Sequence, residues 1–437
     1  MNKKKSFAER NARVSRPERT QVEMQLLSLE QMLPKDHRCR IVWRFVQSLD
    51  LEAFYAEIRV TDSDAGRSAI APEILVSLWF QATLDGISSA RELGRRCETD
   101  MPYLWLCGGV SVNYHTLSDF RVAHADKLDQ ILTTTIAALM HQDLVTLEEL
   151  GQDGMRVRAS AGSSSFRRKP TLQTLHRKAK EHVDQLREES ESEPSDHAKV
   201  DARRKAAAER AAREQEERIR KALEESDQLS KQREKRKKGE GEKTRVSTTD
   251  REARRMKMAN GGYRPAYNVQ FASDSGARVI VGVDVTNQGT DGGQLPPMLD
   301  QIEERYDRLP EYMQVDSAYA TKNSVTDAES RGVQVISTVP RADQLKRHGK
   351  DPHQRQRGDS DEYERFRARM AEPEYVERYK QRPSIAEFPN ADCRNRGLGQ
   401  FRVCGVAKVK AVALWHALAF NFMRMINLGA IESCSTP

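Results

Sequence analysis

The chain has 437 residues, which exceeds the usual domain size of about 100–200 residues and therefore predicts two or three structural units. Charged side chains make up 31% of it and hydrophobic ones only 38%, so part of the chain is expected to lie outside any hydrophobic core. The formal net charge of +7 favours a polyanionic partner without identifying one, because a mild basic excess also serves solubility.

Several functional classes are disfavoured by what the sequence lacks. No run reaches the ~18 apolar residues of a membrane span, and the opening MNKKKSFAERNA has no apolar stretch typical of a signal peptide, so we expect a cytoplasmic protein. The cysteines are scattered without a Cys-x-x-Cys pair, which argues against structural zinc and disulfides. No Walker A loop, G-x-G-x-x-G turn or G-x-S-x-G elbow is present, so no nucleotide cofactor is expected.

The N-terminal part is predicted to be helical. Residues 1–21 are polar and basic without periodicity, which indicates a disordered arm. From 22 to 142 apolar residues recur with the helical period, so we expect an all-α domain. Pro72 is well placed to open one of its helices, and Ser88 or Ser89 can cap the next.

A DNA-contacting helix is predicted within this domain. The segment NYHTLSDFR (113–121) begins with a polar cap candidate and carries His115 and Arg121, which we expect to face a DNA groove. The alternative is a helical packing module that makes no DNA contact.

After residue 143 the period changes from helical to alternating. In GQDGMRVRAS (151–160) the side chains of Asp153, Met155 and Val157 share one face of a predicted strand. A carboxylate on an apolar face costs several kcal/mol unless a partner compensates its charge, and a bound cation would do so. The alternative is an aspartate in a glycine-flanked turn at the strand end.

Residues 161–255 are predicted to form a long charged helical insertion. Of the 40 positions from 201 to 240, 24 are Asp, Glu, Lys or Arg, and large apolar side chains are few. Such a segment cannot build a core of its own, so we expect it to project from the body or to pair weakly with itself.

A second alternating block follows, with the order β-β-β-α-β-α-β counted from the strand of Asp153, which indicates a mixed sheet covered by helices. Thr290 is the predicted cap of its first helix. The predicted strands are YNVQFAS (267–273), VIVGVDV (279–285), the start of YMQVDSAYATKN (312–323), which ends in Asp316, and VQVIS (333–337).

The remaining residues divide into a loop and two helical segments. Residues 341–371 are polar and show no clear period, which predicts a loop or linker. Residues 373–388 are expected to be helical apart from Pro383, and an amphipathic helix follows before a tail at 431–437.

Two carboxylates are expected to meet on the sheet. Asp153 and Asp316 both lie in or at the end of strands that neighbouring positions could bring together. Two close carboxylates repel unless a cation bridges them, and hard oxygen ligands suit Mg²⁺ or Mn²⁺. A third acid would complete a two-metal site for phosphoryl transfer. The candidates for this third acid are Glu372, Glu374, Glu377 and Glu387.

Taken together, five segments resemble bacterial DDE-type insertion-sequence transposases of the IS-eleven-eighty-two-like group. PEILVSLWF and YHTLSDFR are similar to the helical DNA-binding domain of that family. The resemblance spans nearly all of 40–428 and is more specific than any single motif, because order, spacing and flanks agree. The five segments are DGMRVRASA (153–161), MKMANGGYRPAYNVQFASD (256–274), VIVGVDVTNQGTDGGQLPPML (279–299), VDSAYAT (315–321) and YKQRPSIAE (379–387).

The resemblance implies an RNase H-like catalytic domain, here residues 143–160 and 256–430, which binds two divalent metal ions through Asp153, Asp316 and Glu387. The family's Tyr-x-x-Arg signature falls on Tyr379 and Arg382, which the resemblance implies would contact DNA near the scissile phosphate. The sequence departs from neighbouring groups in two ways. Four residues separate the arginine from the glutamate where relatives have three, and a proline interrupts the helix.

The implied function is binding of the ends of an insertion element, cleavage of the DNA and strand transfer, with a homodimer on double-stranded DNA. Arg394 and Lys408 are further candidates for phosphate contacts. Two alternatives stay open at this point. One is a catalytically inactive transposase-derived DNA-binding protein, and the other is an RNase H-like nuclease that cuts DNA without strand transfer.

Overall fold

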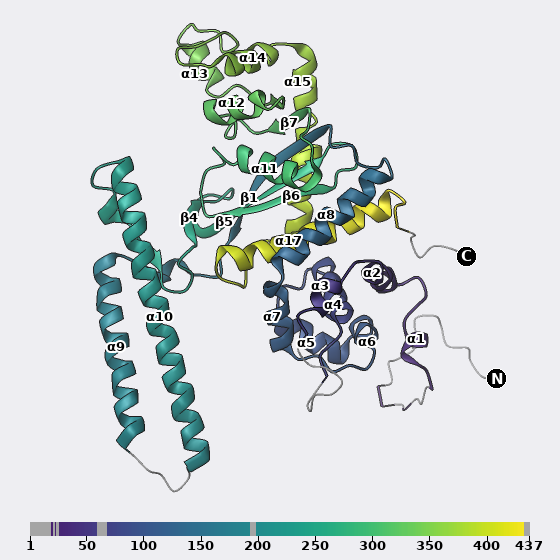
Figure 1. The fold of residues 1–437 in the computed structure, drawn as a ribbon, viewed down its shortest axis with the longest axis vertical. Coiled ribbons are helices and arrows are strands. Elements are labelled where there is room, and N and C mark those ends of the chain that lie inside the picture. Colours follow the sequence, from purple (N-terminus) through teal and green to yellow (C-terminus); the bar gives the residue numbers. More distant parts are fainter. Residues whose placement is uncertain (1–18, 21, 23–25, 59–67, 193–197, 432–437) are drawn as a thin grey trace, which may run out of the picture.

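The computed structural model describes residues 19–20, 22, 26–58, 68–192 and 198–431. Most of the predicted basic arm and nearly all of the tail therefore lie outside the described residues. A central sheet is flanked by helices, with the N-terminal helices on one side and a long helical hairpin projecting from the body (Figure 1). None of the described helices is long and apolar enough to cross a membrane.

Among the described residues before β1, the regular elements are all helices, which agrees with the helical periodicity of the sequence. Pro72 occupies the first turn of α4, where its missing N–H has no partner to lose. Ser89 caps α5 by accepting from the Glu92 amide, and Asn113 caps α7 by accepting from the Thr116 amide at 2.9 Å. The helices are α1 Leu29–Met32, α2 Arg38–Gln47, α3 Glu52–Tyr55, α4 Pro72–Leu84, α5 Ala90–Thr99, α6 Met101–Cys107, α7 Tyr114–Ala123 and α8 Ala125–His141.

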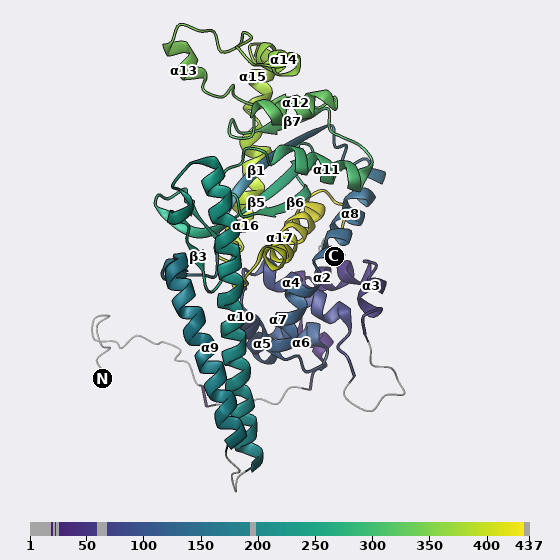
Figure 2. The same ribbon diagram turned by 60° about the vertical axis from the view of Figure 1, so that its left-hand side comes forward.

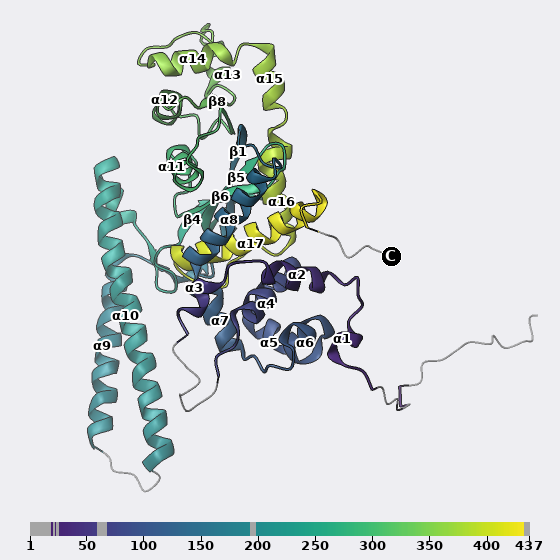
Figure 3. The same ribbon diagram turned by 45° about the vertical axis from the view of Figure 1, so that its right-hand side comes forward.

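The C-terminal helix α17, Val406–Asn427, joins these helices to the sheet. Its Phe422 ring packs against Phe45 and Phe80 at centroid distances of 5.2 and 5.4 Å, and its Asn421 side chain bonds both backbone polar groups of Ile280 in the sheet. Figure 3 shows α17 between the sheet and the N-terminal helices. One continuous hydrophobic core results, which is why α4 is buried around its whole circumference.

The sheet is mixed, and its strand order is β4-β5-β1-β7-β8 with β6 paired to the outer edge of β5. β1 lies antiparallel to β5 and parallel to β7, so the first strand is central and both of its edges are paired. This curled sheet with flanking helices is compatible with an RNase H-like fold. The strands are β1 Glu149–Arg158, β4 Arg254–Lys257, β5 Tyr263–Asp274, β6 Ile280–Thr286, β7 Tyr312–Val315 and β8 Gln334–Ile336.

Helices cover both faces of the sheet. Gly282 faces Met298 of α11, while Gly151 faces Ile385 and Ala386 on the other side, and neither glycine has room for a side chain. The remaining helical elements are α11 Leu295–Tyr306, α12 Lys322–Ser330, α13 Ala342–Arg347, α14 Asp361–Arg369, α15 Pro373–Tyr379, the π-helical turn Pro383–Glu387 and α16 Phe388–Asn395.

Two expectations about local structure were wrong. Residues 341–371 contain α13 and α14 rather than only a loop, because Tyr363 and Phe366 fold into the core with few other apolar residues nearby in sequence. Thr290 does not cap α11, which begins at Leu295; its hydroxyl instead accepts from the Gly292 amide within the preceding turn.

The charged insertion forms an antiparallel hairpin of α9, Lys169–Ser192, and α10, Ala198–Arg236 (Figures 1 and 2). A small cluster of Leu172, Ala222 and Val246 holds its base, separate from the main core. At the base, the short strands β2, Phe166–Arg167, and β3, Val246–Ser247, pair antiparallel and bring the two ends of the insertion together.

We therefore expect the body to fold without the hairpin. Replacing 168–245 by Asn-Gly joins β2 to β3 through a two-residue turn, and it removes no member of the main core. The melting temperature should change by no more than about 4 °C, which corresponds to about 1 kcal/mol for a domain of this size. An unfolded circular dichroism spectrum for the shortened chain would show instead that the hairpin is integral to the fold.

Candidate active site

Asp153 and Asp316 lie on neighbouring parallel strands. Gln152 of β1 pairs with Val315 of β7, and each aspartate follows directly after its paired residue. Because paired strands lie about 4.8 Å apart, the two carboxylates emerge from adjacent backbone positions. The Asp153 side chain is 22% exposed, whereas Asp316 is exposed and its Oδ1 accepts from the Ser317 amide at 2.6 Å.

Glu387 ends the π-helical turn that links α15 to α16. In this turn the Phe388 amide donates to the Pro383 carbonyl, five residues back, so one additional residue fits into the turn. Positions five apart then point the same way, which brings Glu387 beneath Arg382. The additional residue between arginine and glutamate is therefore absorbed locally, and Pro383 sits where its missing N–H is not needed.

Packing fixes this turn against β1. Gly151 leaves room for the Ile385 side chain and Ala386, since a β-carbon there would lie 2.8 Å from Ile385 Cγ2. The Ser273 hydroxyl donates to the Ile385 carbonyl at 2.6 Å. A glycine and a small polar residue on two neighbouring strands thus place Glu387 on the face that carries Asp153.

Arg382 bridges two of the acids. Its Nη2 donates to Asp153 Oδ1 at 2.9 Å and its Nη1 to Glu387 Oε1 at 2.7 Å. The arginine is buried at 8% exposure, and its Nε has no partner among the described atoms. The other Asp153 oxygen accepts from Asn390 Nδ2 at 2.8 Å. Asp153 is therefore held through both oxygens.

The electrostatics of the site follow from burial. Burial raises the pKa of Asp153 to about 6, although the Arg382 charge and the Asn390 hydrogen bond oppose the rise. Burial lowers the pKa of Arg382, but the negative charges of Asp153, Asp316 and Glu387 outweigh it, so the net shift is upward. Burial also raises the pKa of Tyr379. The guanidinium thus remains charged among acids.

Replacing Asp153 by asparagine should stabilise the metal-free protein at neutral pH. Burial raises the pKa of Asp153 in the folded protein to about 6, above its value in the unfolded chain. The protonated carboxyl is tolerated at low pH, and the folded protein loses stability as pH rises through about 6 and the carboxyl ionises. The Asp153→Asn variant should therefore exceed the parent by up to about 3 kcal/mol at pH 8, at ~1.36 kcal/mol per pH unit, and by little at pH 4. Urea unfolding in EDTA at both pH values measures this, and an equal gain at both would contradict it.

The ligand chemistry suits a divalent cation. Asp153, Asp316 and Glu387 offer hard oxygen donors of the kind that Mg²⁺ and Mn²⁺ prefer. Among the described residues, no three His, Cys, Asp or Glu side chains stand close enough to hold a metal ion. The Arg382 guanidinium supplies the positive charge between Asp153 and Glu387 instead, so holding a metal requires its side chain to turn away.

The other acids proposed as the third ligand lie on the surface. Glu377 is 69% exposed and pairs with Lys380, and Glu374 is 67% exposed and pairs with Arg378. Glu372 precedes the first residue of α15 and is also exposed. None of the three contacts Asp153 or Arg382 in the described part of the chain, whereas Glu387 does.

One expected DNA contact was wrong. Arg121 is buried at 7% exposure, donates to the Ser88 carbonyl at 2.6 Å and lies over the Trp79 ring. It is a packing residue, because helix α7 turns that face toward α4 rather than outward. His115, Arg394 and Lys408 are exposed, as a phosphate contact requires.

Asn390 was missed by the sequence reasoning. It is 3% exposed, it donates to Asp153, and its own Oδ1 has no partner among the described atoms. Its spacing of three residues after Glu387 is a helical same-face spacing and was the available signal. An asparagine on a helix is common enough that this spacing alone would not have singled it out.

Two family models match the chain. One, described as "Transposase domain", matches residues 27–123, and the other, described as "Transposase DDE domain", matches residues 240–422. The first covers the helices α1 to α7, and the second covers the sheet from β4 onward with Asp316 and Glu387. Asp153 and most of the hairpin lie between the two matches. No curated protein and no solved structure matches the chain.

Proposed function

The chain belongs to the DDE transposases of insertion sequences and its domain arrangement fits their IS-eleven-eighty-two-like group; from this premise we propose that Asp153, Asp316 and Glu387 form its catalytic triad. Such enzymes cleave DNA and transfer its strands with divalent metal ions. The observation that carries the assignment is that Asp153 and Glu387, from distant segments, share the buried Arg382 guanidinium. Asp316 follows the strand residue that pairs with Gln152, the neighbour of Asp153.

The three acids would hold two Mg²⁺ or Mn²⁺ ions, which when bound polarise the scissile phosphodiester and lower the pKa of the attacking hydroxyl. The chain's own residues keep the site in shape. Asn390 fixes the Asp153 carboxylate, and Arg382 draws Glu387 toward it. Once turned outward, Arg382 can donate to a phosphate oxygen next to the cleaved bond, beside the half-buried Tyr379.

The exposed cations complete the proposed DNA contacts. His115 near the start of α7, Arg394 on α16 and Lys408 on α17 are exposed on three helices packed around the same core. Basic and hydrogen-bonding side chains of this kind bind phosphates irrespective of base sequence. We propose that these residues hold the element end, and that two copies of the chain act together on paired ends.

Metal dependence tests this function. With a duplex that carries the element end, cleavage should require Mg²⁺ or Mn²⁺ and stop in excess EDTA, because the proposed ligands are all carboxylates. Zn²⁺ should not replace them, since no Cys or His belongs to the site. Binding of the same duplex, measured by fluorescence anisotropy, should continue in EDTA. Cleavage that persists without divalent ions would overturn the assignment.

A further inference from the structure

A cavity of about 760 Å³ opens one residue beyond Asp316. Ser317 forms part of its wall, and the remaining walls come from the start of α12, from α13, from the loop after it and from α14. These elements stand together at the end of the molecule opposite the N-terminal helices (Figure 1). The cavity thus adjoins the proposed catalytic acids without including any of them.

The lining is basic. Lys322, Arg341, His348, Lys350 and Arg367 all contribute, and no Asp or Glu lines the cavity. Among the described residues, the side chains of Arg341, His348 and Lys350 make no ion pair or hydrogen bond. Arg341 and Lys350 are thus exposed cations without partners, and such cations on one concave surface suit a negatively charged ligand.

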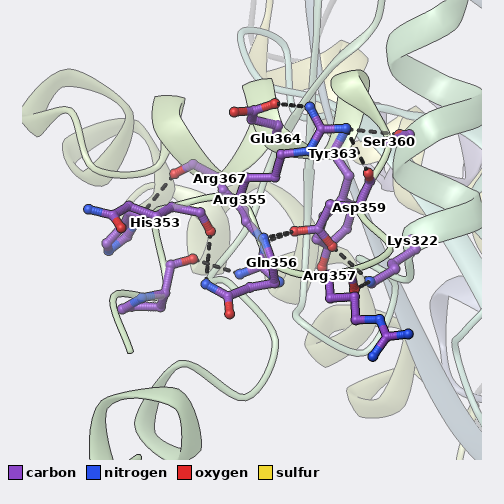
Figure 4. Close-up of polar contacts among 12 residues, drawn as sticks. Lys322, His353, Arg355, Gln356, Arg357, Asp359, Ser360, Tyr363, Glu364 and Arg367 are labelled. Carbon is purple, nitrogen blue, oxygen red and sulfur yellow. Dashed lines mark hydrogen bonds and ion pairs between the residues drawn. The ribbon is translucent and has the colours of Figure 1, made fainter. Parts of the chain in front are cut away.

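The other two cations are fixed by one buried acid. Asp359, whose side chain is fully buried, contacts Lys322 Nζ and Arg367 Nε, both at 2.8 Å. Figure 4 shows Asp359 between these two residues, with the Gln356 amide also donating to it at 2.8 Å. The Lys322 ammonium and the Arg367 guanidinium are thereby held at the wall, and one carboxylate leaves their combined charge positive.

The cavity also has an apolar side and a constrained edge. Pro340 and Leu345 line part of its wall, whereas the Tyr363 ring is only 2% exposed and is covered by the Arg367 guanidinium. Arg341 adopts a left-handed backbone with φ 59°, a conformation that costs a residue with a side chain about 1 kcal/mol and is concentrated at binding sites. An apolar wall can contact the flat face of a base, and fixed cations can bind its phosphate.

We propose that this cavity binds one nucleoside phosphate unit, presented by an unpaired stretch of the DNA strand or as a free nucleotide. The side with Pro340 and Leu345 takes the base, and Arg341 and Lys350 take the phosphate. The cavity volume accommodates a single nucleotide but not a duplex, so the site would bind an unpaired strand. The proposal rests on the proposed function, because DNA reaches the cavity only beside Asp316.

The test compares two double variants that remove equal charge from the full chain. Arg341→Ala/Lys350→Ala removes the two unpaired cationic side chains that line the cavity. Lys346→Ala/Arg347→Ala removes two exposed cations of α13, between the two cavity residues in sequence, that do not line the cavity. The probes are 5′-dAMP, inorganic phosphate, a blunt 20-base-pair duplex and the same duplex with a three-nucleotide single-stranded extension, with affinities measured in EDTA so that no cleavage is needed.

The cavity variant should lose at least tenfold in affinity for 5′-dAMP and for the extended duplex, and less than twofold for the blunt duplex, while the control variant binds all probes like the parent. Loss for the extended duplex alone assigns the ligand to the DNA strand, and loss for 5′-dAMP alone assigns it to a free nucleotide. Equal weakening of blunt and extended duplexes, or parent binding of phosphate as tight as that of 5′-dAMP, would overturn the proposal. A failure of metal-dependent cleavage leaves these affinities unchanged, so the two ideas fail separately.

Discussion

Replacing Glu387 by glutamine is expected to reduce DNA cleavage by on the order of 1000-fold or more. The substitution keeps the size of the side chain and its hydrogen bond with Arg382 but removes the negative charge. A metal ligand contributes several kcal/mol to lowering the activation free energy, and each 1.4 kcal/mol lost slows the reaction about tenfold. Cleavage of the element-end duplex is the measurement. End binding and the melting curve should match the parent, because Glu387 is 52% exposed and outside the core.

Glu377 provides the matched control. It lies ten residues earlier, is 69% exposed and pairs only with Lys380, so Glu377→Gln makes the same chemical change on a solvated surface. We expect its cleavage rate to stay within about twofold of the parent, since surface pairs of this kind contribute little. Full activity of the Glu387 variant, or a loss confined to the Glu377 variant, would place the third ligand elsewhere.

Arg382→Ala should reduce cleavage by about 100-fold to 1000-fold, the usual cost of removing one fixed donor from a reaction centre. In the free protein the arginine joins Asp153 and Glu387, and its loss leaves two acids facing each other without a cation. Arg382→Lys should recover only part of the activity, because an ammonium cannot bridge both carboxylates in the fork geometry of a guanidinium.

Two further measurements separate this role from a merely structural one. Without DNA, the Arg382→Ala variant should bind Mn²⁺ more tightly than the parent by calorimetry, because the guanidinium no longer competes for the same oxygens. Lys380→Ala, two residues away and paired only at the surface, should change neither property. Weaker Mn²⁺ binding after loss of Arg382 would show that the arginine positions the metal ligands rather than competing with the metal for them.

Much of the site could be predicted from local pattern. The alternating run around Asp153 predicted a strand with a carboxylate on its inner face, and the short run before Asp316 predicted a second strand end. Both hold, because strand periodicity depends only on neighbouring residues. The caps at Ser89 and Asn113 were predictable for the same reason, since a side-chain oxygen bonds an amide three residues away.

The sequence by itself thus determined most of the strands and helices, though not α13 and α14, and which acids are of the right kind. Only the tertiary structure decided what surrounds them. Arg121 fits a DNA-facing helix by sequence, yet Trp79 and the Ser88 carbonyl, more than 30 positions earlier, bury it. The π-helical turn that keeps Glu387 aligned forms because Gly151 admits Ile385, more than 230 residues later. Such contacts join residues far apart in the chain, and their free energy depends on burial that no local periodicity records.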